Sequence, residues 1–332
     1  MSVLNIPSEI DGNKLTSIDE YAFANCSLLT SITISNGITN IKDSTFGWCH
    51  SLKSVTLPKG LTSIEEDAFY RCDSLTIINI PESVTSIGYR SFYMCTSLKS
   101  VVLHDGLTSI GALAFYECGS LSNITIPQSV TYIGMSAFYK CSSLTSINIP
   151  QGITSISENV FSGCTSLTSI VLPEGLTSIG NSVFRECSSL TSINIPQGIT
   201  SISENVFSGC TSLTSMVLPE GLTSIGNSVF RKCTSLTSIT IPNSVTTIGN
   251  LAFGECNLLT SITISESVTD IANDAFNGCG SLKEVVFESP ENWVAKSGNT
   301  VVKSFTAEEL SIATTAASLL KSYSSYSWKK EN

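Results

Sequence analysis

Cysteine is the first residue type in this sequence whose number and spacing could do chemistry. The 332-residue chain contains twelve cysteines, and each follows the previous one by 23 residues. They are Cys26, Cys49, Cys72, Cys95, Cys118, Cys141, Cys164, Cys187, Cys210, Cys233, Cys256 and Cys279. So many thiols raise the possibility of disulfide bonds or of a zinc-type metal site. Whether either can form depends on the elements that position them.

The apolar residues follow the same period. Twelve of the fourteen phenylalanines lie three residues before a cysteine, and a leucine lies three residues after every cysteine. Self-similarity at a fixed period of about 20 to 50 residues predicts a solenoid, in which each unit stacks on its neighbours because it cannot bury its apolar face alone. The length of the chain therefore does not indicate how many domains it contains.

The spacing inside one repeat predicts how one coil is built. In residues 29–34, isoleucines alternate with Ser31 and Thr33, which predicts a short strand with one face inward. Proline follows in eight repeats and ends the strand because it has no N–H to donate. A turn, a second short apolar–polar segment and a compact segment complete the unit. In that last segment Phe115 and Cys118 share a face if it forms a helical turn.

This geometry bears directly on the cysteines. Parallel coils place equivalent side chains about 4.7 to 4.9 Å apart and pointing the same way. A disulfide needs two facing Cβ atoms, and tetrahedral zinc needs four converging ligands. We therefore predict buried free thiols that act as small apolar fillers, with no metal and no cofactor. A disulfide formed after oxidation and a metal site are the two alternatives.

The repeat resembles the BspA-like leucine-rich repeat family, whose units read approximately Leu-x-x-Ile-x-Ile-Pro, Val-Thr-x-Ile-Gly and Ala-Phe-x-x-Cys. Residues 121–141 match closely, including Pro127, Val130, Gly134 and Phe138, and the resemblance extends from residue 1 to about residue 288. It implies an α/β fold: a right-handed leucine-rich-repeat solenoid of short parallel strands, with helical turns on the outer side. It also implies a protein at the cell surface or secreted, which serves adhesion or the binding of host proteins.

The two ends differ from the middle. Residues 3–18 form an atypical first unit without a separate cap, which suggests an excised piece or missing upstream sequence. The period stops after Phe287. Thr306 and Glu309 form a capping-box pattern that predicts a helix through Leu320. We therefore expect about twelve repeats in a solenoid over residues 1–288 and a helical C-terminal cap over residues 289–332.

Charge and hydropathy exclude several classes of partner. The chain has 27 acidic and 17 Lys or Arg residues, for a formal net charge of -10, whereas phosphate binding needs clustered Lys and Arg. Nucleic acid and anionic membrane surfaces are therefore poor partners. No stretch approaches the ~20 apolar residues of a membrane span, so we expect no membrane insertion. The first thirty residues also lack the basic start and apolar core of a secretion signal.

Catalytic candidates are few. The only histidines, His50 and His104, occupy different positions in repeats two apart, so they cannot form a pair. His104 stands where most repeats have proline, and we interpret it as a tolerated surface substitution. The sequence contains no Gly-x-Ser-x-Gly, phosphate-loop or His-Glu-x-x-His motif. We predict no catalytic residues and no enzymatic activity.

Two sets of residues are candidates for binding. Polar residues of the predicted strands, among them Ser100, Asn123 and Ser146, form a neutral, hydroxyl-rich face that would suit a protein or a glycan. The alternative is that serine and threonine merely suit a closely spaced sheet. The second set is aromatic, because four successive repeats have tyrosine after the phenylalanine and two more tyrosines lie nearby. These residues are Tyr70, Tyr93, Tyr116, Tyr139, Tyr89 and Tyr132.

The tyrosines also have two interpretations. The repeat forces the first four into one stack, and aromatic stripes are enriched at interfaces. They could equally stabilise neighbouring coils. For the whole chain, the favoured function is an extracellular adhesion or recognition module that binds a host or neighbouring-cell surface protein. The alternative is a structural or intracellular scaffold for protein assembly, which would be cytoplasmic.

Overall fold

Each repeat of the first part of the chain adds one strand to each of two series of parallel strands. The computed structural model describes residues 2–331, and the chain divides into two units, 1–173 and 174–332. The first series in unit 1 is β4 (Leu29–Ile34), β6 (Ser54–Thr56), β8 (Ile77–Asn79), β10 (Ser100–Val102), β12 (Asn123–Ile124), β14 (Ser146–Asn148) and β16 (Ser169–Val171). The second series is β5 (Asn40–Ile41), β7 (Ser63–Ile64), β9 (Ser86–Ile87), β11 (Ser109–Ile110), β13 (Tyr132–Ile133) and β15 (Ser155–Ile156).

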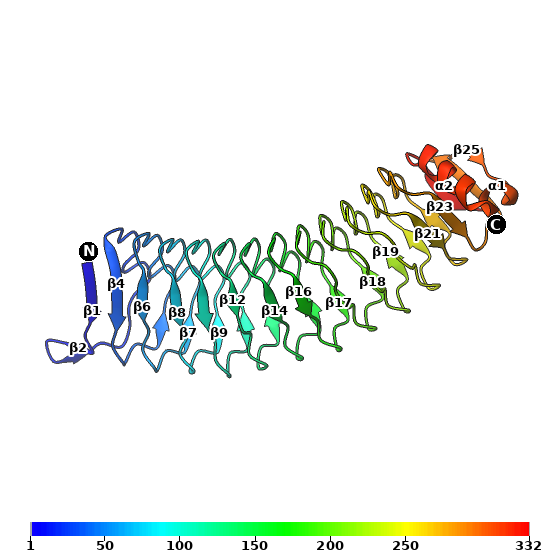
Figure 1. Ribbon diagram of the computed structural model, residues 1–332. Coiled ribbons are helices and arrows are strands. Elements are labelled where there is room, and N and C mark those ends of the chain that lie inside the picture. Colours follow the sequence, from blue (N-terminus) through cyan, green and yellow to red (C-terminus); the bar gives the residue numbers. More distant parts are fainter. Residues whose placement is uncertain (1, 332) are drawn as a thin grey trace. The chain divides into compact units, whose positions relative to one another are not determined.

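The strands pair in parallel with a shift of one repeat. Ser31 pairs with Ser54, and Ile32 pairs with Val55. The same rule holds from β4 onward in a six-stranded sheet of order β1-β4-β6-β8-β10-β12, in which β1 (Ser2–Ile6) pairs with β4 across a longer segment, and in a five-stranded sheet of order β13-β11-β9-β7-β5. The first series is visible in Figure 1 as adjacent arrows that run the same way. Equivalent residues of successive repeats therefore lie side by side, as the period predicts.

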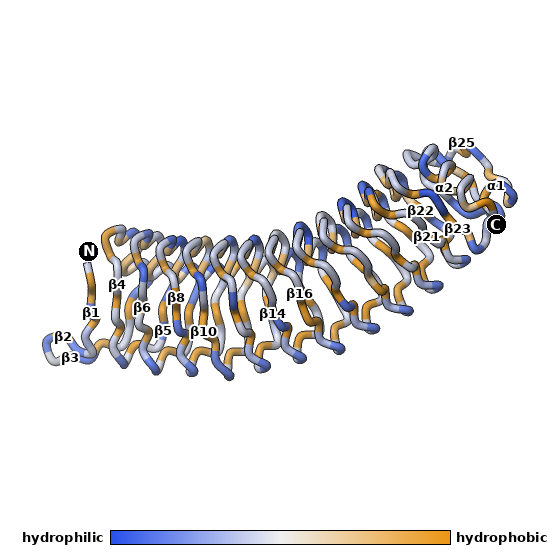
Figure 2. The backbone as a smooth tube through the Cα atoms, in the orientation of Figure 1, coloured by the Kyte–Doolittle hydropathy of each residue, from blue (hydrophilic) through white to orange (hydrophobic). Residues whose placement is uncertain are grey.

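Apolar side chains of every repeat point into the coil. Within each repeat, orange apolar and blue polar segments alternate along the chain (Figure 2). The phenylalanines form a ladder from Phe23 to Phe161 in unit 1, with ring centroids 5.3 to 5.7 Å apart. In unit 2 the ladder from Phe184 to Phe276 has spacings of 5.2 to 5.7 Å. Near-parallel rings at this distance combine large apolar burial with favourable aromatic packing.

The segment around each Phe–Cys pair is a chain of turns, and the predicted helical turn is not confirmed. Among residues 2–331, the only helices lie after residue 306. The Cys49 N–H donates to the Phe46 carbonyl, at 3.3 Å, so a turn with the same three-residue spacing brings the two side chains to one face. Two residues of this segment have positive φ, namely Ser44 (51°) and Trp48 (58°), which a helix does not allow.

The N-terminal strand extends the first sheet. β1 (Ser2–Ile6) pairs in parallel with β4, and its residues are mostly exposed. A hairpin of β2 (Glu9–Ile10) and β3 (Asn13–Lys14) follows. Its two turn residues, Asp11 and Gly12, both have positive φ, which is the conformation of a tight hairpin turn.

Unit 2 repeats the same architecture with fewer paired residues in its first series. The second-series strands are β17 (Ser178–Ile179), β18 (Ser201–Ile202), β19 (Ser224–Ile225), β20 (Thr247–Ile248) and β22 (Asp270–Ile271). In the first series, β21 (Ser261–Ile264) pairs with β23 (Glu284–Phe287). The equivalent segments 192–194 and 215–217 form no strand, although the sequence predicts one in each repeat.

The C-terminal elements pack on the last repeats of unit 2. They are β24 (Trp293–Ser297), β25 (Thr300–Ser304), α1 (Ala307–Ser311), α2 (Ala313–Ser322) and β26 (Ser327–Lys330). β26 lies between β22 and β24 and is antiparallel to both. The predicted capping box of Thr306 and Glu309 is present at α1. The single predicted helix is two helices, because Ile312 is extended (φ -92°, ψ 103°). The break allows Leu310 of α1 and Leu320 of α2 both to be buried.

Aromatic side chains of this segment cover the last phenylalanine of the repeat region. Trp328 stacks on Phe305 with centroids 4.2 Å apart, and its ring lies 6.0 Å from that of Phe287. Trp293 meets Phe287 edge to face at 5.3 Å. Both tryptophans are buried. The repeat part of each unit is thus a parallel-strand solenoid, with about twelve turns over the chain.

Candidate functional site

The predicted stack of tyrosines is present. Tyr70, Tyr93, Tyr116 and Tyr139, here called the tyrosine stripe, have successive ring centroids 5.0, 4.7 and 4.7 Å apart. Their planes are within 11° of parallel. Each follows a buried phenylalanine, so it points away from the core and remains partly exposed. Stacked rings cover one another's faces, so the stripe presents ring edges and hydroxyl groups.

The turn backbone fixes the spacing of the stripe. The Arg71 N–H donates to the Tyr93 carbonyl at 2.8 Å, and the Met94 N–H donates to the Tyr116 carbonyl at 2.7 Å. Arg71 and Met94 have φ of 53° and 55°, and this left-handed conformation aims their N–H groups at the next repeat. The rings are therefore held by rigid backbone, which lowers the entropy that a partner must remove on binding.

Charged side chains flank the stripe on its first repeats. The Arg90 guanidinium lies 4.6 Å from the ring centroid of Tyr70, 5.1 Å from that of Tyr93 and 5.6 Å from that of Tyr89. Its Nε is 3.4 Å from Oδ1 of Asp67, an ion pair without hydrogen-bond geometry. Burial raises the pKa of Asp67 to about 6, although Arg90 acts to lower it. This arginine therefore adds a cation–π contact to an aromatic surface.

The far end of the stripe has a matching arrangement. Lys140 Nζ lies 5.3 Å from the ring centroid of Tyr139 and 3.1 Å from Oε1 of Glu117. Burial raises the pKa of the Tyr93 and Tyr116 phenols, which keeps their hydroxyl groups protonated and able to donate. The stripe is thus a row of donors between two intramolecular cations.

Three further large side chains of unit 1 are exposed. Tyr89, Tyr132 and Met135 are 41%, 54% and 46% exposed. Tyr89 is within reach of Arg90, whereas Tyr132 lies on strand β13 beside Ser109. Large aromatic and methionine side chains that remain in solvent are typical of the centre of protein interfaces.

The predicted hydroxyl-rich positions lie on a different segment of the coil. Ser100, Asn123 and Ser146 belong to β10, β12 and β14, and Ser100 pairs with Asn123. Asn123 and Ser146 are exposed, and Ser100 is partly exposed. The structure therefore separates the nine predicted residues: these three lie on a strand face, the four stacked tyrosines and Tyr89 share Arg90 or ring contacts, and Tyr132 lies on β13.

Most of the thiols are buried. None of the twelve cysteines forms a disulfide bond, and every one except Cys26 is buried. The Cys118 Sγ donates to the Phe92 carbonyl at 3.1 Å, and the same bond recurs from repeat to repeat. Burial raises the pKa of Cys49 to about 11 and that of Cys164 to about 12. Neutral, inaccessible thiols are poor nucleophiles, and residues 2–331 contain no group of three or more potential ligands placed to hold a metal ion.

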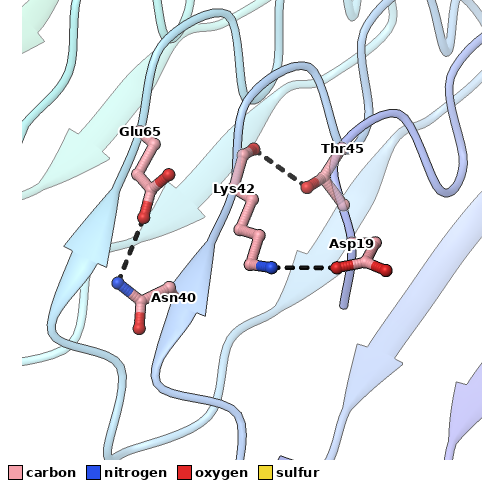
Figure 3. Close-up of polar contacts among 5 residues, drawn as sticks. All are labelled: Asp19, Asn40, Lys42, Thr45 and Glu65. Atoms are coloured by element: carbon pink, nitrogen blue, oxygen red, sulfur yellow. Dashed lines mark hydrogen bonds and ion pairs between the residues drawn. The ribbon is translucent and has the colours of Figure 1, made fainter. Parts of the chain in front are cut away.

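The remaining polar groups mainly join neighbouring repeats. Lys42 Nζ is 2.9 Å from Oδ1 of Asp19, and Asn40 Nδ2 donates to Oε1 of Glu65 at 3.1 Å (Figure 3). His50 Nδ1 is 2.7 Å from Oδ2 of Asp73, at an exposed position. Each contact links residues one repeat apart, or nearly so, as a stacked coil requires.

Two features of the site were not predicted from the sequence: the left-handed turn residues and the position of Arg90. The turn residues do leave a signal. Asn25, Gly163, Gly209 and Gly278 stand immediately before a cysteine and all have positive φ. Asparagine and glycine tolerate this conformation best, so their recurrence at one repeat position indicates it.

The fold and the site define a leucine-rich repeat solenoid. A family model described as "BspA type Leucine rich repeat region (6 copies)" matches residues 16–144, 108–220, 131–259 and 200–325. The chain therefore belongs to the BspA-type leucine-rich repeat family. The family and the fold are those of repeat scaffolds, and leucine-rich repeat proteins generally mediate protein binding. A search of curated proteins finds no match.

Solved structures of bacterial proteins resemble the chain over most of its length. A leucine-rich repeat protein from Bacteroides ovatus is 33% identical over 85% of this chain and 86% of that one, with a TM-score of 0.65. One from Eubacterium ventriosum is 25% identical over 84% and 83%, with a TM-score of 0.59. The pneumococcal vaccine antigen PcpA shares the fold at 21% identity over 86% and 78%, with a TM-score of 0.59.

The helices of the described chain are short. Within residues 2–331, none has the length and apolar character needed to cross a bilayer.

Proposed function

We propose that this chain is a non-enzymatic protein-binding or adhesion module whose tyrosine stripe contacts a host or neighbouring-cell surface protein. The observation that carries the proposal is the stack of four partly exposed tyrosines at 4.7 to 5.0 Å, with Arg90 and Lys140 over its rings. Aromatic rows of this kind supply large contact area at low entropic cost. The serine and asparagine positions of the strand face are a second, polar contact surface.

The proposal includes the organisation of the chain. Residues 1–288 form a right-handed solenoid, and residues 289–332 form a C-terminal cap that protects its last coil. The pairing of β26 with β22 and the burial of Trp293 and Trp328 support the cap. The location is the cell surface or the extracellular medium, which the family resemblance supports. Buried thiols are compatible with that location because burial limits access to oxidants.

The test is a comparison of variants in a quantitative pull-down from host-cell surface extracts. The binding variant is Tyr93→Ser combined with Tyr116→Ser. The fold should tolerate serine, because Ser162 and Ser208 occupy the equivalent positions of later repeats. The matched control is Arg185→Ser at the same repeat position, where the side chain is 51% exposed.

We expect proteins that the wild type and the control retain to be lost from the double variant by at least about ten-fold, since a buried aromatic anchor at an interface contributes about 2 kcal/mol or more. Thermal unfolding should change little. Equal retention by all three chains would refute the role of the stripe. A double variant that unfolds more easily but binds normally would instead assign the stripe to coil stability.

A further inference from the structure

A hollow of about 360 Å³ lies at the carboxyl ends of three consecutive strands of the first sheet. Residues that follow β6, end or follow β8, and follow β10 line it. They are Leu57, Lys59, Asn79, Ile80, Pro81, Glu82 and His104. The volume falls within the range of about 300 to 1,000 Å³ that is usual for small-ligand sites.

The sheet opens where this hollow lies. β4 and β6 pair at three residue positions, of which the last is Thr33 with Thr56. β8 and β10 also pair at three residue positions, of which the last is Asn79 with Val102. Between β6 and β8, the described pairing consists of Ser54 with Ile77 alone. The two strands are therefore not paired at their carboxyl ends, and residues that follow both strands line the hollow.

Two of the lining residues are exceptional within the repeats. His104 replaces the proline of Pro58, Pro81 and Pro127, and Lys59 is the only cation at the position after that proline or its equivalent. The turn itself does not need the histidine. The Leu107 N–H donates to the His104 carbonyl as the Val84 N–H does to Pro81. The substitution therefore leaves the turn unchanged and adds an imidazole to the hollow.

The polar side chains of the hollow are available for a ligand. Within the described residues, Lys59, Asn79, Glu82 and His104 have no side-chain hydrogen bond or ion pair in the structure. Lys59, Asn79 and Glu82 are exposed, and Ile80 is buried beneath them. A lysine and an imidazole suit a carboxylate, the oxygens of Asn79 and Glu82 accept from hydroxyl groups, and Ile80 with Pro81 offers an apolar surface.

We propose that this hollow binds an acidic sugar, a pyranose that carries one carboxylate and several hydroxyl groups, as a uronic acid does. Its carboxylate contacts Lys59 and His104, its hydroxyl groups contact Asn79 and Glu82, and its ring lies on Ile80 and Pro81. The negative charge of Glu82 disfavours doubly charged anions such as hydrogen phosphate. The site is separate from the tyrosine stripe and goes beyond the proposed protein binding.

The test is titration of the full chain with D-glucuronic acid by ligand-observed NMR, with D-glucose and succinate as matched probes. The informative variants are His104→Pro, Lys59→Gln and Asn79→Val. Each restores a residue that the chain itself uses at that repeat position, namely Pro127, Gln128 and Val102. All three should fold with unchanged thermal midpoints. If one does not fold, the other two still test the site.

We expect saturable glucuronate binding in the millimolar range, and a loss of about ten-fold in affinity for His104→Pro and for Lys59→Gln, as for one charge-assisted hydrogen bond. The chain with serine at positions 93 and 116 should bind glucuronate normally, so this test and that of the proposed function fail independently. Absence of saturable binding would overturn the proposal, as would unchanged affinity in the variants. If glucose binds as tightly as glucuronate, the proposed carboxylate contact with Lys59 and His104 is refuted. If succinate binds as tightly as glucuronate, the hollow is not a sugar site.

Discussion

Replacing Phe115 by alanine tests whether the phenylalanine ladder stabilises unit 1. Phe115 is fully buried, with its ring centroid 5.3 Å from that of Phe92 and 5.4 Å from that of Phe138. Truncation of a buried phenylalanine costs about 3 to 5 kcal/mol, and each lost aromatic pair adds about 0.5 to 1.5 kcal/mol. We therefore expect Phe115→Ala to lower the free energy of unfolding by about 5 kcal/mol.

Phe23 provides the internal control, because it stands at the open end of the same ladder. It is partly exposed and has one ring neighbour in the ladder, Phe46, at 5.4 Å. Phe23→Ala loses less buried area and one pair, so we expect a cost of about 2 kcal/mol. Both values can be measured by urea unfolding followed by circular dichroism, in the full chain and at one temperature.

The comparison between the two variants is more informative than either value, because both share one unfolded chain. Equal losses, or a cost below about 2 kcal/mol for Phe115→Ala, would show that neighbouring coils close the space and that the ladder is not the main source of stability. A urea dependence that changes in slope would indicate that the variant unfolds repeat by repeat, which solenoids can do.

Three further predictions follow from burial, charge and close approach. In the native chain at pH 8, a chromogenic disulfide reagent should react rapidly with Cys26 alone and with the eleven buried thiols only in urea; rapid reaction of several native thiols would contradict their burial. Burial raises the pKa of Asp67 from 3.8 to about 6, so its ionisation opposes folding and the free energy of unfolding should fall as pH rises between these values. Asp67→Asn should reduce this fall, and identical pH profiles of the urea midpoint for the wild type and the variant would refute the reasoning. Gly134→Ala would place a Cβ 2.3 Å from the Ala112 nitrogen and should cost about 2 kcal/mol or more, whereas Gly175→Ala meets nothing within 4 Å and should be nearly neutral in thermal unfolding; equal effects would contradict this reasoning.

Much of this architecture could be predicted because a single period determines which residues are neighbours. The parallel stacking of repeats, the burial of the thiols and the stack of Tyr70 to Tyr139 all follow from the spacing of 23 residues. The helical turn was not confirmed, because a three-residue spacing such as Phe46 to Cys49 suits a tight turn as well as a helix. Side-chain periodicity alone does not distinguish the two.

Contacts that depend on backbone conformation or on distant segments could not be predicted. Arg90 reaches Tyr70 because it stands in a left-handed turn, with φ of 52°. The pairing of Trp293 with Lys330 joins strands more than thirty residues apart, and no local pattern specifies that partner. In contrast, the capping box at Thr306 is local and was predicted, while the break at Ile312 serves burial on both sides of it.

The turn that contains each phenylalanine forms hydrogen bonds that run in one direction along the coil. In unit 1 the Phe46 N–H donates to the Ala68 carbonyl, and the Phe69 N–H donates to the Ser91 carbonyl, both toward the following repeat. A gene duplication that inserts one whole repeat therefore presents every donor with a fresh acceptor, whereas an insertion one residue shorter or longer leaves donors facing the wrong atoms. Pairing along the coil therefore favours changes of length in steps of one complete coil, and extra residues fit where they project from the coil, as in the β2–β3 hairpin.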